Sequence, residues 1–160
     1  MKIISRPWSI LLTIILLTGC ASSGRIPTSI GPNHWQGKLS LNTIAPRKSF
    51  QADFEISGST QKGELRLFSP LGQTLAVLSW DSQSADLITQ EGKRQFAKIE
   101  DLIIHTIGTD LPLETLFGWL QGQNIQAKGW QSDLSNWSDG LIRAKRIEPE
   151  ARLILKVDRK

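Results

Sequence analysis

From His34 onward, apolar and polar residues alternate with a period of two, and this pattern constrains the fold more than any other feature of the sequence. The alternation is clear in three segments, 34–42, 50–56 and 63–67. Strands with one apolar and one polar face are typical of antiparallel sheets. The turn-like stretches 45–48 and 58–61 separate them, because Gly, Pro and Ser favour turns there.

A meander is expected to follow through 74–80 and 85–89, with a turn at 91–93. Within 75–78 both faces are apolar, so we expect that strand to be covered on both sides. The tail returns to strand patterns, which we place at 127–131, 134–137, 140–147 and 152–157.

The middle of the chain changes to a helical period. A stripe at Ile99, Leu102, Ile103 and Ile107 predicts one helix, which ends at Gly108. A second short helix is expected after Pro112, with its apolar stripe on Leu113, Leu116, Phe117 and Leu120 and its end at Gly122. The predicted fold is α+β: a curved, incomplete antiparallel β-barrel with two or three short helices covering its open side.

The N-terminal segment has the layout of a secretory signal. Residues 1–19 combine a basic start with a short apolar run at 10–17, which suits a signal peptide better than a spanning helix. The residues before Cys20, the single cysteine, resemble a bacterial lipobox. We therefore expect cleavage before Cys20, lipidation of Cys20, a tether over 20–33 and one domain over 34–160. An ordinary signal with a chance cysteine at its end is the alternative.

Composition limits the function classes further. Without residues 1–19 the basic residues fall from 19 to 17 against 15 acidic residues, a net charge of +2, which is too small to indicate a nucleic-acid partner. With one cysteine there is no internal disulfide, so packing must hold the fold. The five tryptophans after residue 19 suggest a wide apolar interior or an ordinary core.

The sequence contains no pattern that predicts catalysis. His34 and His105 stand far apart, no Cys, His, Asp and Glu set has metal-ligand spacing, and no glycine-rich loop suits a phosphate. The stretch 69–72 lacks the glycine before serine that a nucleophile elbow needs. We expect no enzyme activity, no metal and no cofactor.

Two surface features point toward a membrane or a partner. Basic residues gather near the C-terminal end, where they serve either as a solvated edge or as a contact for an acidic partner or anionic lipid. Pro70 and Gly72 bracket Leu71 in a tight turn. Leu71 either folds back onto the core or probes a membrane, where its burial is worth about 1.5–3 kcal/mol.

Four ordered blocks carry a resemblance to a known family. They are His34-Trp35-Gln36-Gly37-Lys38-Leu39, Gly63-Glu64-Leu65-Arg66-Leu67-Phe68-Ser69-Pro70-Leu71-Gly72, Gly108-Thr109-Asp110-Leu111-Pro112-Leu113 and Leu116-Phe117-Gly118-Trp119-Leu120-Gln121-Gly122. Their order and spacing over 34–157 resemble the LolB family of outer-membrane lipoproteins, which receive other lipoproteins from the periplasmic carrier LolA. The chain is shorter than the better-known members before Trp35 and after Gly122.

The resemblance implies an apolar cavity for acyl chains, delivery of cargo lipoproteins to the outer membrane without nucleotide hydrolysis, and a membrane-insertion role for Leu71. It also implies a periplasm-facing site anchored through Cys20, a LolA-like carrier as partner and a monomer. A solid core built from the same residues is the alternative for each lining position. The candidates for the cavity lining are Leu39, Leu41, Phe54, Ile56, Leu65, Leu67, Leu78, Trp80, Leu116, Trp119 and Leu120.

Two other functions remain open from the residues alone. One is an outer-membrane lipoprotein that acts as a structural or assembly factor and binds a protein partner through its sheet. The other is a lipid-anchored hydrolase, against which the missing nucleophile–base pair argues.

Overall fold

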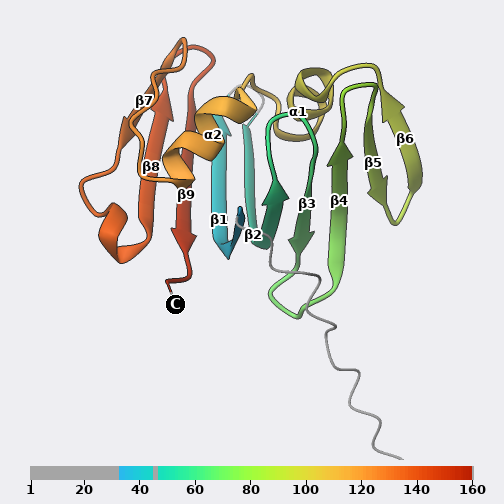
Figure 1. The fold of residues 1–160 in the computed structure, drawn as a ribbon, viewed down its shortest axis with the longest axis horizontal. Helices are drawn as coiled ribbons and strands as arrows, with labels where there is room; N and C mark the ends of the chain where they lie inside the picture. The colour runs from blue at the N-terminus through green and yellow to red at the C-terminus, as the bar shows by residue number, and fades with distance from the viewer. Residues whose placement is uncertain (1–32, 45–46, 160) are drawn as a thin grey trace, which may run out of the picture.

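The computed structural model describes residues 33–44 and 47–159, and these form one nine-stranded antiparallel sheet with two α-helices on one side (Figure 1). The predicted signal peptide, Cys20 and the tether up to residue 32 lie outside the described residues. The strands are β1 His34–Ile44, β2 Arg47–Gly58, β3 Gly63–Phe68, β4 Thr74–Trp80, β5 Ala85–Thr89, β6 Gly92–Phe96, β7 Trp130–Asp133, β8 Leu141–Arg146 and β9 Ala151–Val157.

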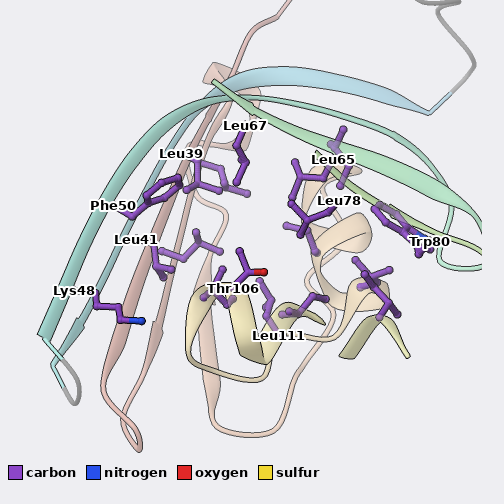
Figure 2. Close-up of a pocket in the computed structure, with 18 of the residues that line it drawn as sticks. Leu39, Leu41, Lys48, Phe50, Leu65, Leu67, Leu78, Trp80, Thr106 and Leu111 are labelled. Carbon is purple, nitrogen blue, oxygen red and sulfur yellow. The ribbon is translucent and has the colours of Figure 1, made fainter. Parts of the chain in front are cut away.

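The sheet is open and does not close into a barrel. Its strand order is β6-β5-β4-β3-β2-β1-β9-β8-β7, so the short strands β6 and β7 form its two edges. The long strands β1 and β2 pair along their whole length and curve around the concave side (Figure 2). The predicted α+β class, with an incomplete, curved antiparallel sheet, is confirmed.

The period of two decides which face of each strand is buried. On β2, Ala52, Phe54 and Ile56 are buried while the residues between them are half-buried. On β9, the alternation of buried and exposed residues is complete from Ala151 to Val157. The buried face of the sheet and the two helices therefore enclose one apolar core.

The helices are α1 Ile99–Ile107 and α2 Leu113–Leu120, both within the predicted segments. Gly108 ends α1 in the left-handed conformation, and its N–H donates to the Ile104 carbonyl at 2.8 Å. Pro112 precedes the first residue of α2, where its fixed φ suits a helix start. A short 3₁₀ helix, η1 Trp137–Asp139, precedes β8.

Several boundary predictions are wrong. The expected strand at 134–137 is a turn leading into η1, because the Asp133 carboxylate accepts hydrogen bonds from the N–H and the hydroxyl of Ser135. Strand β7 starts at Trp130 rather than residue 127, and β2 already begins at Arg47. Strand β6 was not predicted, since nearly every residue of this edge strand is exposed and no apolar alternation marks it. The second face of β4 is half-buried rather than covered.

Four tryptophans connect separate segments of the chain through their indole N–H groups. Each donates to a backbone carbonyl outside the sheet ladders: Trp80 to Ser59 at 2.9 Å, Trp119 to Ile125 at 3.0 Å, Trp130 to Asp110 at 2.7 Å and Trp137 to Leu120 at 3.3 Å. A large ring that is buried, or half-buried as in Trp137, and has a satisfied donor holds two segments together without a disulfide.

Candidate functional site

An apolar cavity of about 370 Å³ lies between the concave face of the sheet and the two helices (Figure 2). Sixteen of its nineteen lining residues among the described part of the chain are apolar, and three are polar. The lining is Leu39, Leu41, Lys48, Ser49, Phe50, Ile56, Leu65, Leu67, Leu78, Trp80, Ile99, Ile103, Thr106, Ile107, Leu111, Leu113, Leu116, Leu153 and Leu155. Such a wall offers water few hydrogen-bond partners, so it favours hydrocarbon over water.

Alternation on the strands and the helical stripe on α1 together produce this wall. Leu65 on β3 pairs with Ile56 on one side and with Leu78 on the other, so three inward-facing side chains form a row. Ile99, Ile103 and Ile107 repeat every four residues, which places them on one face of α1. These stripes explain why strands and helices meet across an apolar space.

Eight of the eleven predicted lining residues lie on the wall of the cavity: Leu39, Leu41, Ile56, Leu65, Leu67, Leu78, Trp80 and Leu116. Phe54, Trp119 and Leu120 do not line it and are instead at most 3% exposed in the packed core. Trp119 packs edge-on against Trp130, with ring centroids 6.3 Å apart, and its indole N–H is held by the Ile125 carbonyl. These contacts direct Trp119 toward the β7 end of the sheet rather than toward the cavity.

The sequence interpretation missed eleven lining residues. Four of them belong to the predicted helical stripes, which were the signal that could have found them: Ile99, Ile103, Ile107 and Leu113. Leu111 lies between the two helices and belongs to neither stripe. Phe50, Leu153 and Leu155 fall on the inward phase of predicted strands, so the alternation could have found them. Nothing in the pattern marks the polar Lys48, Ser49 and Thr106 as part of the wall.

Leu71 occupies the tip of the loop between β3 and β4 and is 89% exposed, the largest value among the exposed large apolar residues of the described chain. The Gly72 N–H donates to the Ser69 carbonyl at 2.8 Å, which closes the turn around Pro70 and Leu71. A second bond, from the Ser69 N–H to the Gln73 carbonyl at 2.8 Å, fixes the base of the loop. Leu71 therefore does not fold back onto the core.

Four of the basic residues near the C-terminal end lie on the outer face of the sheet, away from the cavity. Arg143 and Lys145 on β8 and Arg152 and Lys156 on β9 are exposed. Arg152 lies 3.4 Å from the Glu150 carboxylate, and Arg143 lies 3.8 Å from Asp133. Exposed pairs of this kind contribute little to stability, so the outer face remains a solvated, mostly basic surface.

The described residues hold no group of side chains arranged to bind a metal ion. His105 contacts the guanidinium of Arg94, with Nη1 and Nε2 2.8 Å apart, and packs beside Phe96. None of the helices among these residues is both long and apolar enough to cross a membrane.

Comparison with known proteins gives one consistent result. The family model described as "LolB: Outer membrane lipoprotein LolB" matches residues 33–158. The outer-membrane lipoprotein LolB of Vibrio cholerae is 30% identical over 137 residues, which cover 79% of this chain and 67% of that protein. The proteins of the same name from Vibrio atlanticus and Ralstonia nicotianae are each 27% identical, covering 83% and 78% of this chain and 67% and 73% of their own lengths.

Proposed function

The chain belongs to the LolB family of outer-membrane lipoproteins, and from that premise we propose that it accepts lipoproteins from a LolA-like periplasmic carrier. In this proposal the cavity encloses acyl chains of the cargo, and the protein then releases them into the outer membrane without nucleotide hydrolysis. The observation that carries the proposal is the apolar cavity itself, with sixteen apolar residues in its wall. Family membership agrees with the prediction that the chain is not an enzyme.

The physical need for such a cavity follows from the cost of exposing hydrocarbon to water. Each methylene moved out of an apolar environment costs about 0.8 kcal/mol, so a fatty chain cannot cross the periplasm unprotected. The cavity volume of about 370 Å³ falls near the lower end of the range of about 300–1,000 Å³ typical of ligand sites. It suits one hydrocarbon chain at a time in the conformation described here.

Transfer then runs down a gradient of affinity. The carrier holds the chains less tightly than this cavity, and the bilayer holds them more tightly still. We propose that residues 1–19 are removed, that lipid on Cys20 keeps the protein at the periplasmic leaflet of the outer membrane, and that residues 20–33 tether the monomeric domain of residues 34–160. One hydrocarbon chain alone anchors only marginally, so a lipidated cysteine with more than one chain fits stable attachment.

Leu71 is proposed to lower the barrier for cargo to leave. Its 89% exposure leaves the side chain free to enter a bilayer, and the turn that holds it is closed by backbone hydrogen bonds. Burial of one leucine is worth about 1.5–3 kcal/mol, enough to bring the loop onto a membrane but not to anchor the domain.

The decisive experiment is transfer of a labelled lipoprotein from purified carrier to residues 20–160 carrying Cys20→Ser, followed by release to vesicles. We expect uptake by the protein and release only when vesicles are present. Leu71→Glu should keep the uptake step and slow release to vesicles by about tenfold, since it removes the apolar insertion of the loop. Absence of uptake by the unmodified domain refutes the proposed function. Unchanged release by Leu71→Glu refutes the role of that residue.

A further inference from the structure

Among the described residues that line the apolar cavity, Lys48 is the one that carries a charge. The alternation of β2 explains its position. Phe50, Ala52, Phe54 and Ile56 face the concave side, and Lys48 is the next residue in the same phase. The side chain of Lys48 therefore belongs to the inward face of the sheet although it is cationic.

Lys48 stands at the rim of the cavity. Its side chain is exposed and yet lines the space, so it joins the apolar interior to solvent. Figure 2 shows its amino group extending from β2 toward the cavity, at the end away from Trp80. Within residues 33–44 and 47–159, no carboxylate forms an ion pair with it, since the five ion pairs there involve other residues.

The other two polar wall residues are not comparable donors. The Thr106 hydroxyl already donates its hydrogen to the Leu102 carbonyl at 2.9 Å, inside α1. Ser49 is exposed and lies on the opposite phase of β2 from Lys48. A ligand chain in the cavity therefore meets one directed cation, at one end.

The arginines nearest Lys48 lie on the outward phase of their strands and do not line the cavity. Arg47 precedes Lys48 on β2, and Arg152 on β9 pairs with Asn42 of β1, beside Thr43, the register partner of Lys48. The carboxylate nearby is Glu150, and it lies 3.4 Å from Arg152. An apolar space with a single cation, Lys48, at its rim fits a hydrocarbon chain that ends in an anion.

We propose that the cavity also binds a single-chain anionic amphiphile, with its hydrocarbon chain along the apolar wall and its carboxylate or phosphate at the Lys48 Nζ. This inference rests on the proposed function in one respect, that the cavity admits acyl chains. It adds a ligand class, fatty acids or singly acylated phospholipids, and assigns Lys48 as the residue that distinguishes them from neutral chains. A bound anionic chain would compete with cargo for the same space.

The test uses residues 20–160 with Cys20→Ser and isothermal titration calorimetry with three probes: dodecanoate, dodecyl phosphate and dodecanol. Lys48→Gln is compared with Lys128→Gln, which changes an exposed lysine outside the cavity wall. We expect Lys48→Gln to weaken binding of the anionic probes by about threefold to tenfold, as expected for loss of one partly exposed charge-assisted contact, and to leave dodecanol unchanged. Lys128→Gln should change none of the three.

Each result bears on one claim. A larger effect on dodecyl phosphate than on dodecanoate identifies a phosphate-bearing lipid as the better ligand, and the reverse identifies a fatty acid. If Lys48→Gln affects anionic and neutral probes equally, or affects neither, the assignment of Lys48 is wrong while acyl binding stands. If no probe binds the unmodified protein, both the inference and the proposed cavity function fail. Circular dichroism and thermal unfolding of each variant show whether the fold is retained.

Discussion

Filling the cavity should stabilise the domain, whereas the same substitution in its packed core should destabilise it. Leu65 is half-buried although both of its cross-strand neighbours, Ile56 and Leu78, are at most 3% exposed. Leu65 lines the cavity, so its remaining accessible surface faces that space. Leu65→Trp places an indole, which is larger than the leucine side chain, in the empty space of the cavity.

The size of the effect follows from the buried area. An indole in place of the leucine side chain adds the equivalent of roughly three methylenes, at about 0.8 kcal/mol each when fully buried. Allowing for the loss of side-chain freedom, we expect a gain of about 1–2 kcal/mol in the free energy of unfolding, which raises Tm by about 3–6 °C. Overpacking a filled core instead costs about 1–3 kcal/mol. The sign of the change therefore decides between a hollow and a solid interior.

Leu120→Trp is the matched control. Leu120 is 1% exposed, lies on α2 and does not line the cavity. The same change should lower the free energy of unfolding by about 1–3 kcal/mol, because no space receives the ring. Urea unfolding, monitored by far-ultraviolet circular dichroism of the backbone, measures the free energy of unfolding of both variants. An unchanged m value supports a common unfolded state.

Uptake of an acyl chain provides the second measurement on the same variants. Leu65→Trp should weaken binding of dodecanol, because the indole occupies space that the ligand needs. If Leu65→Trp proves as destabilising as Leu120→Trp, the interior at Leu65 is packed, and the proposal that this space receives acyl chains loses its basis.

Two further predictions concern parts of the fold away from the cavity. Gly140 and Gly108 share a φ of 77°, but a Cβ on Gly140 would lie 2.1 Å from the Val157 carbonyl oxygen and one on Gly108 would meet nothing within 4 Å. Gly140→Ala should therefore cost about 3 kcal/mol or more and Gly108→Ala about 1 kcal/mol, and equal losses in urea unfolding would contradict this reasoning. Backbone N–H groups of Gln83 and the residue after it hold the pKa of Asp81 below its ordinary value, so the stabilisation is present at neutral pH and is lost as pH falls through that lowered pKa. The Tm difference between the unmodified protein and Asp81→Ala should shrink as pH falls below the ordinary carboxyl pKa of 3.8, and a constant difference would show that the carboxylate charge plays no part.

Much of the architecture could be predicted from the sequence because one face of the sheet is buried. A strand such as β9 shows this directly, since Leu153, Leu155 and Val157 must share a face that their neighbours do not. Both helices were predicted within one or two residues because Gly108 and Pro112 mark their boundaries. Strand β6 gave no such signal, since an exposed edge strand buries too little to impose a pattern.

Positions within the buried face were harder to assign. Alternation places Phe54 and Ile56 on the same face of β2, yet Ile56 lines the cavity and Phe54 packs into solid core. The difference depends on which side chains approach from other elements. Trp119, for example, is drawn toward Trp130 and the carbonyl of Ile125, contacts between segments that the local pattern cannot relate.

Lys48 is the converse case, a residue that lines the cavity although the sequence pattern does not predict it. The sequence pattern predicts that Lys48 ends the turn-like stretch 45–48, and it gives no reason to place this lysine on a cavity wall. The register of β2 against β1, with Lys48 opposite Thr43, fixes that placement. Only the pairing of the long strands shows that β2 extends its inward face to the rim.

The hollow itself follows from a mismatch between the sheet and what covers it. Nine strands spaced about 4.8 Å apart span roughly 38 Å along the curved sheet, whereas helices of nine and eight residues are each only about 12–14 Å long. The two helices therefore cannot cover the whole concave face. Trp119 and Trp130 fill the concave face at the end beside β7. At the other end α1 faces the sheet, and the cavity lies between them. A ligand that occupies the remaining space restores apolar contacts that the chain does not supply, so its binding must raise the stability of the domain, and the gain grows with the logarithm of ligand concentration once that exceeds Kd.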